Sequence, residues 1–225
     1  MKIAVLGTGM VGRTIAGRLA GLGHEVIVGT RDPQATLART EPDGMGTPAF
    51  GTWAGANPGV GLATMADAAA GAELVVNATG GAGAVPALAE ADADNLAGKV
   101  ILDISNPLDF SAGFPPTLFV KDTDSLGEQI QRAFPAARVV KSLNTLTAGL
   151  MVDPASLGAE STVFVSGDDA DAKATVSQLL RSFGHTDVID LGDISTARGT
   201  EMWLPLWLRL MGALGTANFN LKVVR

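Results

Sequence analysis

The glycine pattern Gly7-Thr8-Gly9-Met10-Val11-Gly12 is the sequence feature that most constrains how this chain folds. It follows an apolar run at residues 3–6, and apolar residues then recur at helical spacing until Gly23. A G-x-G-x-x-G pattern between a strand and a helix is typical of a dinucleotide-binding turn. The first glycine permits the turn, the second lets backbone approach a pyrophosphate, and the third lets helix and strand pack closely.

Short apolar segments that alternate with helical patterns continue along the chain. Further strands are predicted at residues 25–29, 60–63, 73–78, 99–104, 138–142, 162–166 and 188–191. Helices are predicted at 125–134, from about 196, and in a segment that carries Val176, Leu179, Leu180 and Phe183 and ends at Gly184. This alternation predicts an α/β fold with a doubly wound, mainly parallel Rossmann sheet and a small C-terminal helical extension. We expect a dinucleotide-binding domain over residues 1–145 and a smaller C-terminal α/β part over 146–225 that continues the fold.

Residues 41–61 form the longest segment without a clear period. They are rich in Gly, Pro, Asn and Thr, which predicts a surface excursion and a candidate lid.

The composition excludes several classes of partner. A formal net charge of −7, without a basic run, disfavours nucleic acid and anionic membrane surfaces. Because the chain has only two histidines and no cysteine, we expect no transition-metal site. The apolar stretch at 202–214 is interrupted by Pro205 and Arg209 and is shorter than the ~20 residues of a membrane helix. Six residues before the glycine turn are too few for a signal peptide, so we expect a cytoplasmic location.

The end of the second predicted strand indicates which dinucleotide is bound. NAD-binding folds usually place an acidic residue there to contact the ribose 2′-hydroxyl, whereas this chain has Gly29-Thr30-Arg31. A guanidinium suits a 2′-phosphate, which favours NADP over NAD. Asp32 is the alternative, as an acid displaced along the chain, but Pro33 after it favours a helix cap.

Few residues offer acid-base chemistry. The chain has no tyrosine, and His24 and His185 lie at predicted helix-strand corners, where we expect capping or surface roles. Lys141 and Asn144 resemble a β-hydroxyacid dehydrogenase pair, but their spacing in a predicted strand sends them to opposite faces unless the strand bends. We therefore predict no catalytic acid-base residue. A flavin or deazaflavin acceptor needs none, because its ring delocalises the charge of the hydride and takes a proton from water.

Several longer stretches together resemble the NADPH-dependent reductases of the deazaflavin coenzyme F420, a family whose fold is also similar to the reductase domain of membrane ferric reductases. The resemblance rests on residues 3–12, on 23–31, on Asp103-Ile104-Ser105-Asn106-Pro107, on 140–145, and on 165–169. It covers nearly the whole chain. It implies NADP as cofactor, coenzyme F420 or a flavin as co-substrate, and a homodimer.

The resemblance also implies roles for individual residues. Thr8 to Val11 would hold the pyrophosphate, Thr30 and Arg31 the 2′-phosphate, and Asn77 to Thr79 would lie along the ribose and nicotinamide. Family members often have a proline where this chain has Thr79-Gly80-Gly81. Together with Asn144-Thr145 as a polar floor beneath the nicotinamide, the predicted cofactor-binding set is Gly7, Thr8, Gly9, Met10, Val11, Gly12, Thr30, Arg31, Asn77, Ala78, Thr79, Asn106, Asn144 and Thr145.

The segment 201–218 would cover the acceptor site in such a fold. Trp203, Trp207 and Met211 form a stripe on it with two interpretations, a core or dimer interface and a wall of the acceptor site. Two other functions stay open from the sequence, an imine or ketone reductase acting on a small molecule and a non-catalytic NADP-sensing protein.

Overall fold

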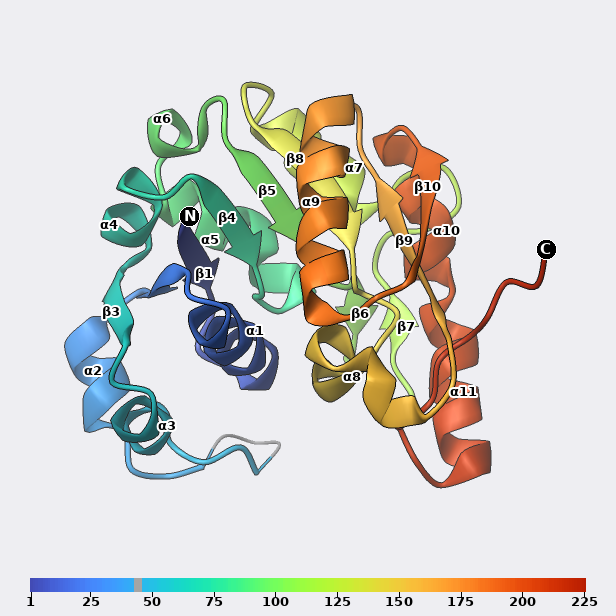
Figure 1. Ribbon diagram of the computed structural model, residues 1–225, viewed down its shortest axis with the longest axis horizontal. Coiled ribbons are helices and arrows are strands. Elements are labelled where there is room, and N and C mark those ends of the chain that lie inside the picture. Colours follow the sequence, from blue (N-terminus) through green and yellow to red (C-terminus); the bar gives the residue numbers. More distant parts are fainter. Residues whose placement is uncertain (43–45) are drawn as a thin grey trace.

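The computed structural model describes residues 1–42 and 46–225, and its centre is a sheet of eight strands (Figure 1). The strands are β1 Lys2–Leu6, β2 Glu25–Thr30, β3 Val60–Thr64, β4 Leu74–Asn77, β5 Val100–Asp103, β8 Arg138–Ser142, β9 Thr162–Ser166 and β10 Asp187–Gly192. Their order is β10-β9-β8-β5-β4-β1-β2-β3. All neighbours pair in parallel except β8 and β9. The predicted Rossmann-type, mainly parallel sheet is confirmed.

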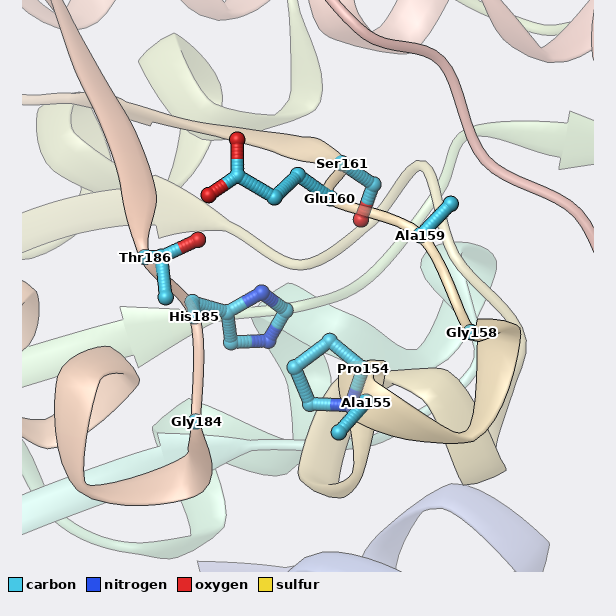
Figure 2. A pocket seen from close by; sticks show the side chains of 9 residues that line it. All are labelled: Pro154, Ala155, Gly158, Ala159, Glu160, Ser161, Gly184, His185 and Thr186. Atoms are coloured by element: carbon cyan, nitrogen blue, oxygen red, sulfur yellow. The ribbon is translucent and has the colours of Figure 1, made fainter.

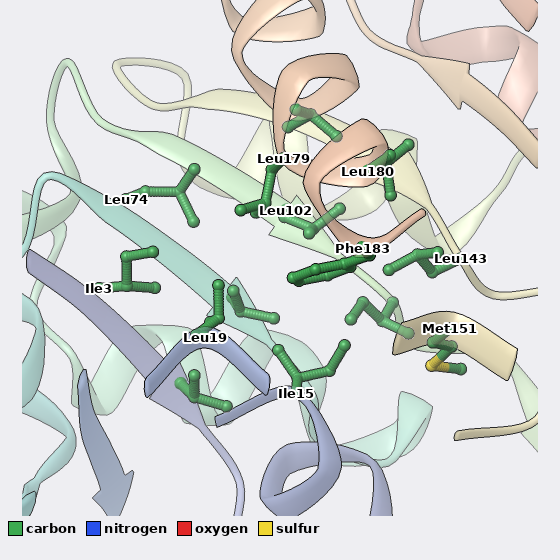
Figure 3. Packing of buried hydrophobic residues seen from close by; sticks show 14 of the residues in the cluster. Ile3, Ile15, Leu19, Leu74, Leu102, Leu143, Met151, Leu179, Leu180 and Phe183 are labelled. Carbon is green, nitrogen blue, oxygen red and sulfur yellow. The ribbon is translucent and has the colours of Figure 1, made fainter. Parts of the chain in front are cut away.

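Helices cover both faces of this sheet. One face packs against α1 Met10–Gly21, α3 Phe50–Ala56, α8 Ala148–Val152 and α9 Ala170–Phe183. The other packs against α4 Met65–Ala70, α5 Ala84–Glu90, α6 Ala93–Leu96, α7 Leu126–Ala133 and α10 Ala197–Met202. Figure 3 shows the core on the α1 and α9 face, where Ile15 and Leu19 of α1 and Phe183 of α9 meet strand residues. This alternation of layers buries both faces, which explains the nearly continuous apolar strands.

Smaller elements complete the chain. They are α2 Pro33–Ala38, the 3-10 turns η1 Gly81–Gly83, η2 Pro154–Leu157 and η3 Ile194–Thr196, the hairpin of β6 Leu108–Asp109 and β7 Thr117–Leu118, and α11 Leu204–Leu214. Among the described residues, no helix is long and apolar enough to cross a membrane.

Local signals in the sequence explain where several helices begin and end. Asp32 accepts a hydrogen bond from the Ala35 N–H, and Pro33 is the first residue of α2, so the predicted cap is confirmed. Ser125 caps α7 in the same way. Gly184 ends α9 with φ 108°, a conformation that favours glycine.

The prediction that residues 41–61 form an excursion without regular structure is wrong for part of the described segment, whereas the lid role stays a prediction. The segment contains α3, whose Phe50 is only 3% exposed. The Arg13 guanidinium lies over the Phe50 ring at 5.3 Å and donates to the Pro48 carbonyl oxygen. Burial of Phe50 against α1 anchors this segment to the core, which the glycine-rich composition concealed. Residues 43–45 lie outside the described residues.

The C-terminal region differs from its prediction in one respect. The apolar helix expected from about residue 196 is divided, because α10 ends at Met202 and α11 begins at Leu204 with Pro205 in its first turn. Strands β9 and β10 of the C-terminal part extend the same sheet. The division of the chain into two parts at residue 145 stays a prediction.

Candidate functional site

A groove of about 690 Å³ lies outside the carboxyl ends of β1, β2 and β4, where open α/β sheets bind ligands. Seven of the predicted cofactor-binding residues line it, namely Gly7, Thr8, Gly9, Thr30, Arg31, Ala78 and Thr79. Met10, Val11, Gly12, Asn77, Asn106, Asn144 and Thr145 are not among its lining residues. The groove therefore contains the glycine turn and the tip of β2, but not the polar residues that follow β5 and β8.

The three glycines of the turn occupy different environments. A Cβ atom at Gly12 would lie 2.0 Å from the Gly7 carbonyl oxygen, and one at Gly7 would lie 2.6 Å from the Ala78 carbonyl oxygen. Gly7 also has φ 123°. No described atom lies within 4 Å of a Cβ built on Gly9. Gly7 and Gly12 are thus required by the fold, whereas Gly9 faces the open groove.

The first turn of α1 is suited to an anion. Gly9 is its N-cap and supplies no side-chain hydrogen bond, and the turn carries no acidic residue. The free backbone N–H groups and the helix dipole favour negative charge at this end. The turn can therefore bind a phosphate through its backbone.

Two arginines lie at the β2 end of the groove. Arg31 was predicted, whereas Arg39, which follows α2, was missed because no local pattern brings it near the glycine turn. Within residues 1–42 and 46–225, neither guanidinium has a hydrogen bond or ion pair. Thr30 Oγ1 lies 2.8 Å from Thr36 Oγ1. With Asp32 occupied as a helix cap, this end of the groove offers cationic groups to a ligand.

A buried ion cluster lies beside the groove. Lys141 Nζ is 2.5 Å from Asp103 Oδ2 and 2.9 Å from Glu201 Oε1, and donates to the Ser105 carbonyl oxygen at 2.7 Å. Glu201 also accepts from the backbone N–H groups of Leu126 and Gly127 at the start of α7. Burial lowers the pKa of Lys141, but the two carboxylates outweigh it, so the pKa lies above its ordinary value.

The sequence did not predict this cluster. The only signal was a charged residue next to the apolar residues of each of two strands, Asp103 in β5 and Lys141 in β8. The buried ion pairs make Lys141 a structural cation.

Asn144 pairs with Asn106, in the turn that follows β5. Its side-chain amide donates to Asn106 Oδ1 at 3.0 Å, and the Asn106 amide donates to the Asn144 carbonyl oxygen at 2.8 Å. Leu143 has φ 62°, so the chain bends directly after β8. A Cβ at Gly81 would lie 1.9 Å from the Asn106 carbonyl oxygen. The glycine that stands near the family's usual proline therefore allows the turns after β4 and β5 to touch.

A second pocket, of about 300 Å³, is lined by segments that flank β9 and β10 (Figure 2). It contains Glu160, Ser161 and His185 but no Lys or Arg. The expected surface position of His185 is wrong, because this residue is 2% exposed. The alternative of a capping role agrees with the structure, since His185 Nε2 lies 3.0 Å from the carbonyl oxygen of Met151 in the last turn of α8. Burial lowers the pKa of His185. This pocket lacks the cations that suit a phosphate ligand.

The stripe on the C-terminal helices is partly covered by the chain itself. The Trp207 ring stacks on Phe219 with centroids 5.2 Å apart. Leu206 and Leu214 on the same helix are exposed.

Comparison with known proteins decides the family. A family model described as "NADP oxidoreductase coenzyme F420-dependent" matches residues 2–107. A crystal structure from Arthrobacter sp. FB24, provisionally named as an F420-dependent NADP reductase, is 66% identical over 100% of both chains, with a TM-score of 0.97. The chain belongs to the family of F420-dependent NADP oxidoreductases.

Two curated relatives show how broad this family likeness is. The F420-dependent NADP reductase of Methanothermobacter marburgensis is 29% identical over 93% of this chain and 92% of its own length. The metalloreductase STEAP3 of Rattus norvegicus is 30% identical over 92% of this chain, which spans 38% of that longer protein. The predicted family resemblance is confirmed, and the chain is an NADP-dependent oxidoreductase by family.

Proposed function

We propose that this F420-dependent NADP oxidoreductase homologue transfers a hydride between NADPH and a deazaflavin, coenzyme F420, or a flavin. The observation that carries the proposal is the groove, which joins an anion-binding glycine turn to two arginines without partners among the described residues. The F420-dependent reductase from Methanothermobacter marburgensis, matched over nearly its full length, supports the choice of acceptor.

In this proposal the residues of the groove bind and orient the dinucleotide. Gly7, Thr8 and Gly9, with the first turn of α1, hold the pyrophosphate. Arg31 and Arg39 hold the 2′-phosphate, because a guanidinium matches phosphate geometry with two parallel hydrogen bonds.

The nicotinamide would lie beyond Thr79, near the turns after β5 and β8. There the Asn106 and Asn144 pair and Thr145 form the polar floor. The acceptor would lie between this floor and the C-terminal helices. When bound, the dinucleotide supplies the hydride, while the chain aligns the two rings and excludes water.

The direct test mixes the purified protein with NADPH and oxidised coenzyme F420 and follows the deazaflavin absorbance. Rapid, NADPH-dependent loss of that absorbance supports the proposal, and a slower reaction with NADH supports NADP preference. Flavin mononucleotide in parallel identifies a flavin acceptor. Tight NADPH binding without hydride loss to F420 or to a flavin would instead favour a non-catalytic NADP sensor.

The assembly needs a separate measurement. The predicted homodimer remains part of the proposal, supported by the exposed apolar side chains on α11. Sedimentation velocity of the purified protein distinguishes one copy from two.

A further inference from the structure

A chain of buried polar contacts leads from α10 to the wall of the groove. Glu201 pairs with Lys141 and Lys141 with Asp103, at 2.9 and 2.5 Å. Asp103 Oδ1 accepts from Asn77 Nδ2 at 2.8 Å, and Asn77 Oδ1 contacts Thr79 Oγ1 at 2.7 Å. Of these five residues, only Thr79 lines the groove. The contacts therefore connect the C-terminal helices with the wall of the groove.

The directions of the hydrogen bonds around Asn77 are determined by backbone N–H groups, which can only donate. Asp103 Oδ1 accepts from the backbone N–H of Ser105 at 3.1 Å, so it is an acceptor and the Asn77 group that faces it is the NH₂. The other side of the same amide must then be the carbonyl oxygen. The backbone N–H of Thr79, 3.4 Å away, points at that oxygen and agrees with this orientation.

This orientation leaves Thr79 with one possible role toward a ligand. A hydroxyl has a single proton, and a contact of 2.7 Å with a carbonyl oxygen requires that Thr79 donate it to Asn77. The lone pairs of Oγ1 are all that remains for the groove. A ligand atom that meets Oγ1 must therefore donate a hydrogen bond, which a phosphate oxygen without a proton cannot do.

The position of Thr79 selects the donor. A Cβ at Gly7 would lie 3.4 Å from the Thr79 backbone nitrogen, so Thr79 borders the turn assigned to the pyrophosphate. The hydrogen-bond donors nearest to the pyrophosphate in a dinucleotide are its ribose hydroxyls. We infer that Thr79 is a specificity-determining residue that accepts a hydrogen bond from a ribose hydroxyl of the bound dinucleotide. This inference rests on the proposed binding of NADPH in the groove.

The test compares Thr79→Val, which keeps the shape and removes the hydroxyl, with Thr79→Ser, which keeps the hydroxyl. Calorimetric titration with NADPH should show a roughly tenfold weaker Kd for the valine variant, the usual effect of one lost hydrogen bond. The serine variant should stay within about twofold of the wild type on the same reasoning. Thermal melting of the ligand-free proteins checks that both variants fold.

Three results would overturn the inference. Unchanged affinity in Thr79→Val would show that the hydroxyl makes no ligand contact. Tighter binding would show that its lone pairs face a phosphate, since their removal would relieve repulsion. An equal loss in Thr79→Ser would assign the effect to the methyl group.

Titration with adenosine 2′,5′-bisphosphate then identifies the ribose. A loss in Thr79→Val with this fragment and with NADPH indicates the adenosine ribose, and a loss with NADPH alone indicates the nicotinamide ribose. Either result supports the inference. Because binding is measured and not turnover, failure to reduce coenzyme F420 would refute the proposed function and leave the Thr79 result standing.

Discussion

The glycine turn allows a substitution that separates folding from binding. In Gly9→Ala the new methyl group meets no described atom within 4 Å, and Gly9 has φ −75°, which alanine adopts easily. The cost to stability is then the weaker N-cap alone, at most about 1 kcal/mol. For a chain of this length that lowers the Tm by about 2–4 °C.

The same methyl group points into the space assigned to the pyrophosphate. Overpacking a fitted contact costs about 1–3 kcal/mol, which corresponds to a loss of NADPH affinity of about 5- to 150-fold. Calorimetric titration with NADPH, together with melting of the ligand-free protein, measures both quantities. We expect a nearly native Tm and a large loss of affinity.

Gly12→Ala is the matched control. Its methyl group would lie 2.0 Å from the Gly7 carbonyl oxygen, so α1 and the turn must move apart. The ligand-free Gly12→Ala variant should therefore be less stable than the wild type, with a Tm well below that of Gly9→Ala. The reasoning is refuted if Gly9→Ala binds NADPH as the wild type does, or if the two variants lose equal stability.

Three further predictions concern charge. Arg31→Ala should weaken NADPH binding by about tenfold or more and leave NADH binding unchanged, because only NADPH has a 2′-phosphate that accepts charge-assisted hydrogen bonds. Equal losses of affinity for NADPH and NADH in fluorescence titrations would exclude that contact. Glu201→Gln should lower stability in urea by about 1.5–3 kcal/mol, whereas Glu160→Gln, whose side chain is 71% exposed, should be neutral. Because burial lowers the pKa of His185 below 6.5, the unfolded chain binds the extra proton first. Stability should therefore fall as pH decreases below 6.5, less steeply in His185→Gln, and equal urea midpoints at pH 5 and 7 would contradict this.

The sequence alone determined the features that depend on neighbouring residues. The close approach of Gly12 to Gly7, the cap at Asp32 and the end of α9 at Gly184 each follow from short-range sterics and hydrogen bonding. Apolar periodicity predicted the strands that form the parallel sheet. The family was also available from the sequence, since the stretches that carry it are contiguous.

Only the tertiary structure decided which distant side chains meet. Arg39 joins Arg31 in the groove, and Phe50 enters the core through a segment that composition presents as a loop. Lys141, Asp103 and Glu201 come from two strands and a helix, and no local pattern encodes their contact. Burial is what makes that contact selective, because a charge removed from water requires its partners nearby. That requirement acts between elements brought together by the sheet order, and therefore appears only once the chain is folded.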